Sequence, residues 1–193
     1  MTTIKVILGS TRPNRFGPKA AQWIMDVAKD IPGATFELVD LADMNLPLLD
    51  EPIPAKEDKY SLDHTKRWAE VVGAADGFVF VVPEYNHGVG AAVKNAFDYL
   101  YKEWNYKPIA FASYGADAGG TRSVEHLRMT ASYLKMYDIC EQVNMPFYWK
   151  QLDAQGNLTV TEGQVGAAQA MLKEIVFWTE HLKPVREARL QLK

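Results

Sequence analysis

Cysteine is almost absent from the sequence, in which Cys140 stands alone among 193 residues. A single cysteine excludes an internal disulfide and any CxxC redox or zinc motif. Because an isolated cysteine is most often a small buried apolar side chain, we expect Cys140 to be buried. The four histidines are far apart and lack HExxH spacing, and no GxSxG motif occurs. Metal-dependent hydrolysis and a serine hydrolase therefore have little support, and we expect no metal site.

A basic excess and long apolar runs are also missing. The formal net charge is -3 and the pI is about 5.8, which argues against a nucleic-acid surface. No run approaches the roughly 18 apolar residues of a membrane span, and the start, MTTIKVILGS, lacks the pattern of a signal peptide. We expect a cytoplasmic protein that binds neither nucleic acid nor membranes. The length suits a single domain over residues 1–193.

Short apolar runs rich in Val, Ile and Phe predict the strands. Four clear runs lie at 4–9, 34–40, 77–83 and 108–115, and a weaker fifth lies at 137–143. The run at 34–40 alternates between apolar and polar residues, whereas the other three clear runs are nearly continuous in apolarity. We therefore expect 34–40 to lie nearer an edge of the sheet.

Helical periodicity separates these strands. Ala20, Ile24, Val27 and Ala28 share one helical face, as do Val93, Phe97, Leu100 and Trp104. Further helices are expected over 62–75, 120–134 and 162–182, the last ending before Pro184, and 44–60 is expected to be a long proline-rich loop. The alternation of strands and helices predicts an α/β fold, a doubly wound five-stranded parallel sheet with helices on both faces.

Ligands of such sheets bind outside the carboxyl ends of the strands, and three polar stretches follow strands there. The first, GSTRPNRFG at 9–17, matches neither GxxxxGK[ST] nor GxGxxG. Its strand-to-helix turn can bind a phosphate through free N–H groups, with charge-assisted contacts from Arg12 and Arg15. The alternative is a solvated turn in which Ser10 caps a local backbone group.

The other two stretches suit a flat ring. In PEYNHGVG, at 83–90, Glu84, Tyr85 and Asn86 offer backbone amides, an aromatic ring and an amide side chain; the alternative is a surface turn with His87 in solvent. The glycines of SYGADAGG, at 113–120, would let the backbone approach a ring closely, although the stretch alone is also typical of an ordinary glycine-rich loop. The acidic pair and phosphate-accepting Asp of a response regulator are missing from the corresponding places.

Together these loops resemble the NADPH-dependent FMN reductases, flavodoxin-like flavoenzymes that include quinone, azo-compound and chromate reductases. The resemblance covers about residues 4–130, and PEYN followed by KNAFDYL is its most specific part. It implies that the anion is the phosphate of FMN. The FMN-binding residues it implies are Ser10, Arg12, Arg15 and Gly17 around the phosphate, Pro83, Glu84, Tyr85 and Asn86 beside the ribityl chain and ring, and Ser113, Tyr114 and Gly115 on the ring's other side.

The resemblance implies an oxidoreductase that takes hydride from NADPH or NADH and reduces quinones or other small acceptors (azo compounds, metal oxyanions, flavins) by a ping-pong mechanism. The flavin carries this chemistry, so we expect no catalytic side chain. One alternative is a flavodoxin-type electron carrier that binds FMN without nicotinamide-dependent turnover, for which a net charge of -3 is weakly acidic. Another is a flavin-free nucleotide-binding module. Many family members have a serine and a proline where this chain has Gly88 and Gly90.

A homodimer or homotetramer is also implied by the resemblance. Ala92, Ala96 and Tyr99 form a second face on the helix of residues 91–104, and the final helix is apolar over much of its circumference. One domain rarely buries so much helix surface alone. The alternative is a monomer whose aromatic residues pack on the long loop.

Overall fold

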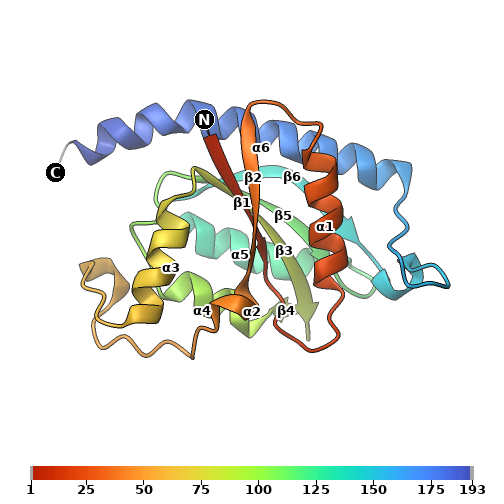
Figure 1. The fold of residues 1–193 in the computed structure, drawn as a ribbon, viewed down its shortest axis with the longest axis horizontal. Helices are drawn as coiled ribbons and strands as arrows, with labels where there is room; N and C mark the ends of the chain where they lie inside the picture. Colours follow the sequence, from red (N-terminus) through yellow and green to blue (C-terminus); the bar gives the residue numbers. More distant parts are fainter. Residues whose placement is uncertain (1, 192–193) are drawn as a thin grey trace.

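The computed structural model describes residues 2–191 and is built around a parallel sheet (Figure 1). Its spatial order is β2-β1-β3-β5-β6, and every pairing along this order is parallel. The strands are β1 (Thr2–Leu8), β2 (Ala34–Asp40), β3 (Gly77–Tyr85), β5 (Pro108–Tyr114) and β6 (Tyr137–Met145). A short β4 (Gly88–Val89) pairs antiparallel with the end of β3. The doubly wound, flavodoxin-like sheet is thus confirmed, including the fifth strand.

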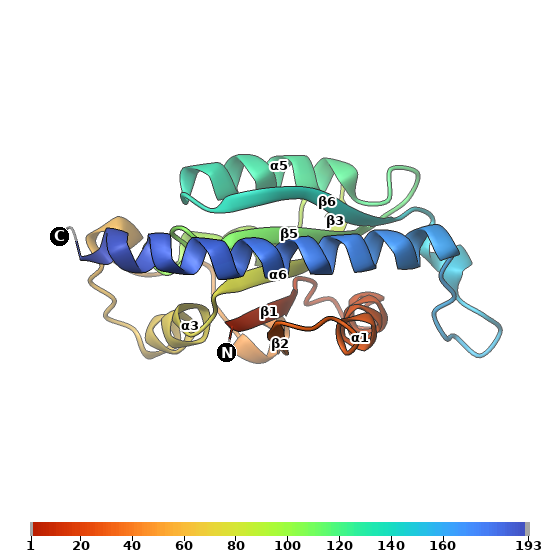
Figure 2. The same cartoon turned by 90° about the horizontal axis from the view of Figure 1, so that it is seen from above.

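Helices cover both faces of the sheet. On one face, α1 (Gly17–Ala28) and α6 (Glu162–Leu190) pack against buried side chains of β1, β3, β5 and β6. On the other lie α3 (Asp63–Gly73), α4 (Ala91–Asp98) and α5 (Thr121–Tyr133). Figure 2 shows α6 crossing the sheet along the whole length of the molecule. Of the apolar residues of α6 that suggested a dimer surface, Val165 and Trp178 are half-buried, and the others are buried within the chain: Ala168, Met171, Leu172, Ile175 and Val176.

Burial along each strand follows its place in the sheet. Every residue of β5 is buried, whereas β2 alternates between half-buried and exposed positions at the edge, as its sequence predicts. Cys140 is exposed, which contradicts our expectation that it is buried. It lies on β6, the other edge strand. In β6 the inward positions are occupied by Ile139 and Val143, so Cys140 points to the opposite side.

The helix expected to end before Pro184 continues to Leu190. Asp76, between α3 and β3, accepts hydrogen bonds from Lys183 (3.1 Å) and Arg186 (2.5 Å), which flank the proline. Pro184 itself is exposed, so water can reach the backbone carbonyl that the proline leaves without a donor. The ion pairs thus hold the last turns of α6 against the body of the protein.

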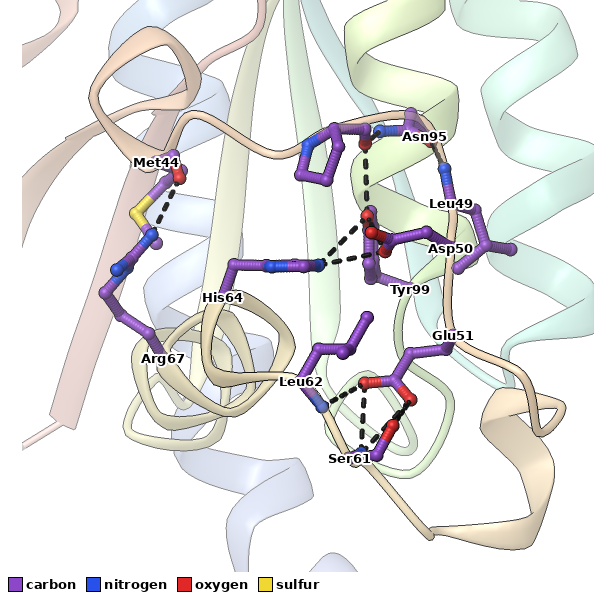
Figure 3. A network of polar contacts seen from close by, with 11 residues as sticks. Met44, Leu49, Asp50, Glu51, Ser61, Leu62, His64, Arg67, Asn95 and Tyr99 are labelled. Carbon is purple, nitrogen blue, oxygen red and sulfur yellow. Dashed lines mark hydrogen bonds and ion pairs between the residues drawn. The ribbon is translucent and has the colours of Figure 1, made fainter.

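The long loop between α2 (Leu41–Met44) and α3 covers the second face of α4 (Figure 3). The Tyr99 hydroxyl donates to Asp50 (2.9 Å) and to the Pro47 carbonyl (3.1 Å), and burial together with Asp50 raises the pKa of Tyr99 to about 12. His64 Nε2 lies 2.9 Å from the same Asp50 carboxylate. Ala96 and Tyr99 are fully buried and Ala92 is half-buried, so the chain itself covers most of this face.

Asp76 generates a stability prediction. Burial raises the pKa of this carboxyl, but the Thr3 amide, Lys183 and Arg186 lower it more, and it lies below its ordinary value. Asp76→Asn should cost about 2 to 3 kcal/mol in urea unfolding at pH 7. Because a lowered pKa stabilises above the unfolded-state value near 3.9, the difference should shrink as the pH falls below about 4. Asp30→Asn, at an exposed carboxylate, is the control, and equal losses in both variants would contradict the prediction.

Candidate functional site

The polar loops that follow the strands meet around one cavity of about 320 Å³ at the carboxyl ends of the sheet. Three of them are the predicted stretches after β1, β3 and β5. The fourth is the segment after β6, which includes a short 3-10 helix, η2 (Tyr148–Gln151). Of the predicted residues, the cavity is lined by Ser10, Arg12, Arg15, Pro83, Glu84, Tyr85, Tyr114 and Gly115.

One end of the cavity lies at the start of α1. The helix begins at Gly17 with Pro18 behind it, no side chain caps it, and its first turn holds no acidic residue. Pro18 carries no N–H and the Lys19 N–H donates to the Phe16 carbonyl at 2.9 Å, so the helix dipole and the N–H groups that stay free favour an anion. Gly17 is not a lining residue, but a Cβ there would fall 2.5 Å from Leu8 Cδ1 and 2.9 Å from the Tyr114 hydroxyl. Glycine is thus required for Tyr114 to reach the first turn of the helix.

Tyr114 carries a buried hydroxyl that has no hydrogen-bond partner among residues 2–191. Burial is the main cause that raises the pKa of this phenol, so it stays protonated and is a donor. Buried polar groups in folded proteins almost always have a partner. Ser10 is also buried in this region, where its hydroxyl lies 2.9 Å from that of Tyr85. At the start of α1, the Tyr114 hydroxyl is thus a hydrogen-bond donor that a ligand can use.

The two arginines of the first loop have different surroundings. Arg15 forms an ion pair with Asp40, whose other oxygen accepts a hydrogen bond from the Ala42 amide at 2.9 Å. Arg12 is exposed, and its guanidinium carbon lies 5.8 Å from the centre of the Tyr85 ring. No carboxylate of residues 2–191 pairs with Arg12. The uncompensated positive charge at this end of the cavity is therefore that of Arg12.

A tight hairpin carries the second loop. Asn86 and His87 have φ values of 50° and 62°, and Tyr85 pairs with Gly88, which is the pattern of a two-residue primed turn. Asn86 is exposed at this turn and does not line the cavity. Gly90 has an ordinary φ of -62° at the N-cap of α4, so the backbone there needs no glycine.

Glu84 ties this hairpin to α5. Its carboxylate accepts a hydrogen bond from the Arg122 amide at 3.0 Å and from the Arg122 guanidinium at 2.5 Å. The guanidinium also reaches Asp117. The acidic side chain is nearly buried and sits at the start of a helix, where a negative charge is favourable. Glu84 therefore positions the loop on which Tyr85 is mounted.

Ser113 holds the third loop in place. It is buried and does not line the cavity. Its hydroxyl donates to the Gly119 carbonyl at 2.8 Å. A Cβ on Gly120, whose φ is 92°, would lie 2.6 Å from the Ser113 Cβ. Gly115 bonds through its N–H to Met145 and through its carbonyl to Tyr148. The loop is thus fixed between β5 and the segment after β6.

An aromatic wall completes the cavity, and sequence reasoning missed it. The Phe16 ring centre lies 5.1 Å from that of Tyr114 and 4.7 Å from that of Tyr148, and Tyr148 lies 5.3 Å from Trp149. Trp149 is 50% exposed at the rim. The available signal was PFYWK at 146–150, three aromatic residues directly after a strand. The lining residues that the sequence did not indicate are Asn14, Phe16, Ala116, Tyr148, Trp149 and Leu152.

The arrangement suits an elongated ligand with an anionic end and a flat apolar end. The charge of Arg12 and the dipole of α1 lie at the start of that helix, and the aromatic wall extends from Phe16 at the helix start to Trp149 at the rim. Within residues 2–191 no group of His, Cys, Asp and Glu has the arrangement of a metal site. None of the helices over the same range is long and apolar enough to cross a membrane.

Comparison with known proteins gives one consistent result. The family model described as NADPH-dependent FMN reductase matches residues 2–150. An NAD(P)H-dependent FMN reductase of Schizosaccharomyces pombe is 44% identical over 135 residues, which are 69% of this chain and 67% of the relative. An NADPH:quinone oxidoreductase of Arabidopsis thaliana is 29% identical over 166 residues, 80% of this chain and 81% of that protein.

A solved structure supports the fold. The flavoenzyme NAD(P)H:(acceptor) oxidoreductase FerB from Paracoccus denitrificans superposes with a TM-score of 0.73 at 19% identity. The match covers 94% of this chain and 98% of the other. At this identity the likeness establishes a shared architecture.

Proposed function

The chain belongs to the NADPH-dependent FMN reductase family, and we propose that the cavity at the carboxyl ends of its strands is where it holds FMN. It is an FMN-dependent NAD(P)H oxidoreductase. The observation that carries the placement is the buried Tyr114 hydroxyl without a partner, which lies beside the uncapped start of α1. A phosphate supplies the missing acceptor.

The phosphate end of the cavity fits in charge as well as in hydrogen bonding. The N–H groups of the first turn of α1 and the hydroxyls of Ser10 and Tyr114 offer donors, and Arg12 offers an unpaired positive charge. Arg15 contributes in a second way, because its pair with Asp40 keeps that carboxylate from repelling the phosphate. Gly17 acts by leaving room for Tyr114.

The ring end is supported by the two loops that face each other across the cavity. Pro83 and Tyr85 on the hairpin and Gly115 on the third loop line it, and all three belong to rigid segments. Glu84, which lines the cavity, and Ser113, which lies outside it, shape these loops. Phe16, Tyr148 and Trp149 add an apolar surface that excludes water from one side of the ligand.

When bound, FMN accepts hydride from NAD(P)H and delivers electrons to the acceptor. The protein binds the phosphate, orients the ring and leaves one side of it accessible, so no side-chain general base is needed. Quinones are the acceptor class that the Arabidopsis relative's name supports, and other small acceptors need the same open ring face. An electron carrier without nicotinamide-dependent turnover is disfavoured, because the relatives are named as reductases.

We further propose that a second copy of the chain covers the outer face of α4 and α5. The two faces that suggested a dimer from sequence are mostly buried within the chain, with Ala92, Val165 and Trp178 half-buried. A groove of about 890 Å³ lies between α4 and α5. Met129 and Tyr133 are 68% and 70% exposed on it. The groove reaches Val89 of the hairpin that carries Tyr85, so the partner lies close to the flavin.

The enzyme should be yellow as purified or after addition of FMN, and anaerobic NADPH should bleach the flavin absorption. Because one cavity serves donor and acceptor in turn, initial-rate plots at several quinone concentrations should be parallel. A flavodoxin-type carrier would keep its colour on addition of NADPH. Intersecting rate plots would contradict the ping-pong mechanism. A colourless protein that takes up no FMN would contradict the function itself.

Phosphate contacts predict that Arg12→Ala weakens FMN binding while leaving riboflavin binding unchanged. Loss of one charge-assisted contact costs about 1.5 to 3 kcal/mol, and exposure of Arg12 reduces this to about tenfold in affinity. Arg15→Ala should also weaken FMN, and adding Asp40→Asn should recover part of the loss, because the unpaired carboxylate is removed. Both ligands are titrated into apoprotein by fluorescence quenching.

The control for these variants is Lys29→Ala, which removes an exposed charge at the far end of α1. Equal losses for FMN and riboflavin would show that the loop holds another part of the ligand. Unchanged FMN affinity together with lost discrimination between NADPH and NADH would instead place the 2′-phosphate of NADPH at Arg12.

Sedimentation equilibrium at micromolar concentration should give a dimer of the 21.7 kDa chain. Tyr133→Glu with Met129→Lys should dissociate it, because charges placed on an apolar interface lose their hydration. The matched variant Phe177→Glu, on the exposed side of α6, should remain dimeric. A wild-type protein that sediments only as the monomer would rule out the second copy.

A further inference from the structure

A second cavity, of about 590 Å³, lies at the opposite end of the sheet from the flavin site. Its walls come from segments that surround the amino ends of the strands. They include Gly73 at the end of α3, Lys107 directly before β5 and Lys135 between α5 and β6. The part of α6 beyond Pro184 adds Arg186 and Arg189. The unexpected continuation of α6 is therefore what brings these two arginines to the cavity.

Positive charge dominates the lining. Lys102, Lys107, Lys135, Arg186 and Arg189 face only two acidic lining residues, Asp58 and Glu103. The carboxylates are largely engaged already: Asp58 pairs with Lys102 at 2.6 Å, and Glu103 accepts a hydrogen bond from the Tyr60 hydroxyl at 2.8 Å.

Arg186 forms an ion pair at 2.5 Å with Asp76, which lies outside the cavity. Lys107, Lys135 and Arg189 make no ion pair with any carboxylate of residues 2–191. Asp76 and Glu103, the carboxylates that attract Lys107, already bond other groups, and the cations that share the cavity repel one another. The cavity therefore has an excess of positive charge that a bound anion would neutralise.

Lys107 is the most buried of the three cations. It is 4% exposed, and its ammonium group donates to the Val72 carbonyl at 2.8 Å and the Gly73 carbonyl at 3.2 Å. These carbonyls take two of the three N–H donors of an ammonium group. Burial, followed by the nearby Arg186, lowers the pKa of Lys107 to about 7. Its Nζ also lies 5.6 Å from the centre of the Phe78 ring, and a buried ammonium group without an ion-pair partner is costly.

The other two cations are fixed around Tyr106. The Lys135 ammonium lies 5.9 Å from the centres of the Tyr101 and Tyr106 rings, and the Tyr106 amide donates to the Lys135 carbonyl at 2.8 Å. A hydrogen bond from Arg189 is the main cause that lowers the pKa of the Tyr106 hydroxyl. The charges thus come from separate elements and converge on one space.

We propose that this cavity binds a small polyanion that carries two or more phosphate or carboxylate groups. A single small anion would neutralise only part of the charge of Lys107, Lys135 and Arg189. The volume is in the range of ordinary ligand pockets, so it accommodates more than one acidic group. The site lies at the other end of the sheet from the flavin and does not depend on flavin reduction.

The test uses the FMN-loaded protein, so that the phosphate site at α1 is already filled. Calorimetric titration with tripolyphosphate and with citrate should show saturable binding at one site per chain. Lys107→Met and Arg189→Ala should each weaken binding at least fivefold and leave the flavin spectrum unchanged. Lys29→Ala makes the same change in net charge away from the cavity and should have no effect. Binding of tripolyphosphate alone would assign a phosphate site, and binding of citrate alone a carboxylate site.

A pH series separates Lys107 from the permanent charges. Sulfate keeps its charge between pH 6 and 8, so its affinity reports on the protein. Protonated Lys107 binds an anion better, and sulfate affinity should therefore fall up to about tenfold from pH 6 to pH 8. Arg186, Asp76, Glu103 and Lys5 also face Lys107, and a flat profile in Lys107→Met assigns the titration to Lys107 itself.

Two outcomes would overturn the proposal. One is the absence of saturable binding with both polyanions. The other is binding that Lys29→Ala weakens as much as the cavity variants do, which would indicate attraction to the protein surface in general. If Lys107→Met does not fold, Arg189→Ala at the exposed end of α6 decides the matter alone.

Discussion

A parallel sheet that is covered on both faces has only its two ends available for polar chemistry. Here β1, β3 and β5 are buried by helices from both sides, so neither water nor ligand reaches their middle. Parallel strands also direct every loop of one type to the same end. The carboxyl ends therefore gather three glycine-containing loops and an aromatic segment, and the amino ends gather arginines from α6 and lysines from the turns before β5 and β6.

Carboxylates that lie near these ends fix the loops in place. Glu84 connects the hairpin after β3 to the start of α5, Asp40 holds Arg15 beside α1, and Asp76 joins β1 to the last turns of α6. Each of these carboxylates has at least two donors, so removal of one contact does not leave the charge alone. Glu84 and Asp40 in this way hold two of the loops that surround the cavity at the carboxyl ends.

Much of the fold was predictable from sequence because strand burial and helix periodicity are local patterns. The edge position of β2 follows from its alternation, and the four apolar residues from Val93 to Trp104 are buried, although α4 ends at Asp98. Pro184 misled us because its cost is local, whereas the compensating ion pairs with Asp76 join residues more than a hundred positions apart. Cys140 misled us because the sequence did not show which side of β6 faces the core.

The candidate site was predictable where loops follow strands directly and was missed where tertiary packing decides. Ser10, Tyr85 and Tyr114 belong to motifs, but Phe16 and Tyr148 meet only because α1 lies beside the segment after β6. The assignment of residues to FMN, the single domain over 1–193 and the cytoplasmic location stay predictions.

One helix connects the two ends of the sheet. At its start, Gln164 of α6 donates to the Asn144 carbonyl, next to the aromatic segment, and near its end Arg186 reaches the cationic cavity. Its 29 residues span about 44 Å, and its middle is anchored by the buried Ile175 and Thr179. A single helix thus contacts the strand end that leads into the aromatic wall of one cavity and itself lines the other.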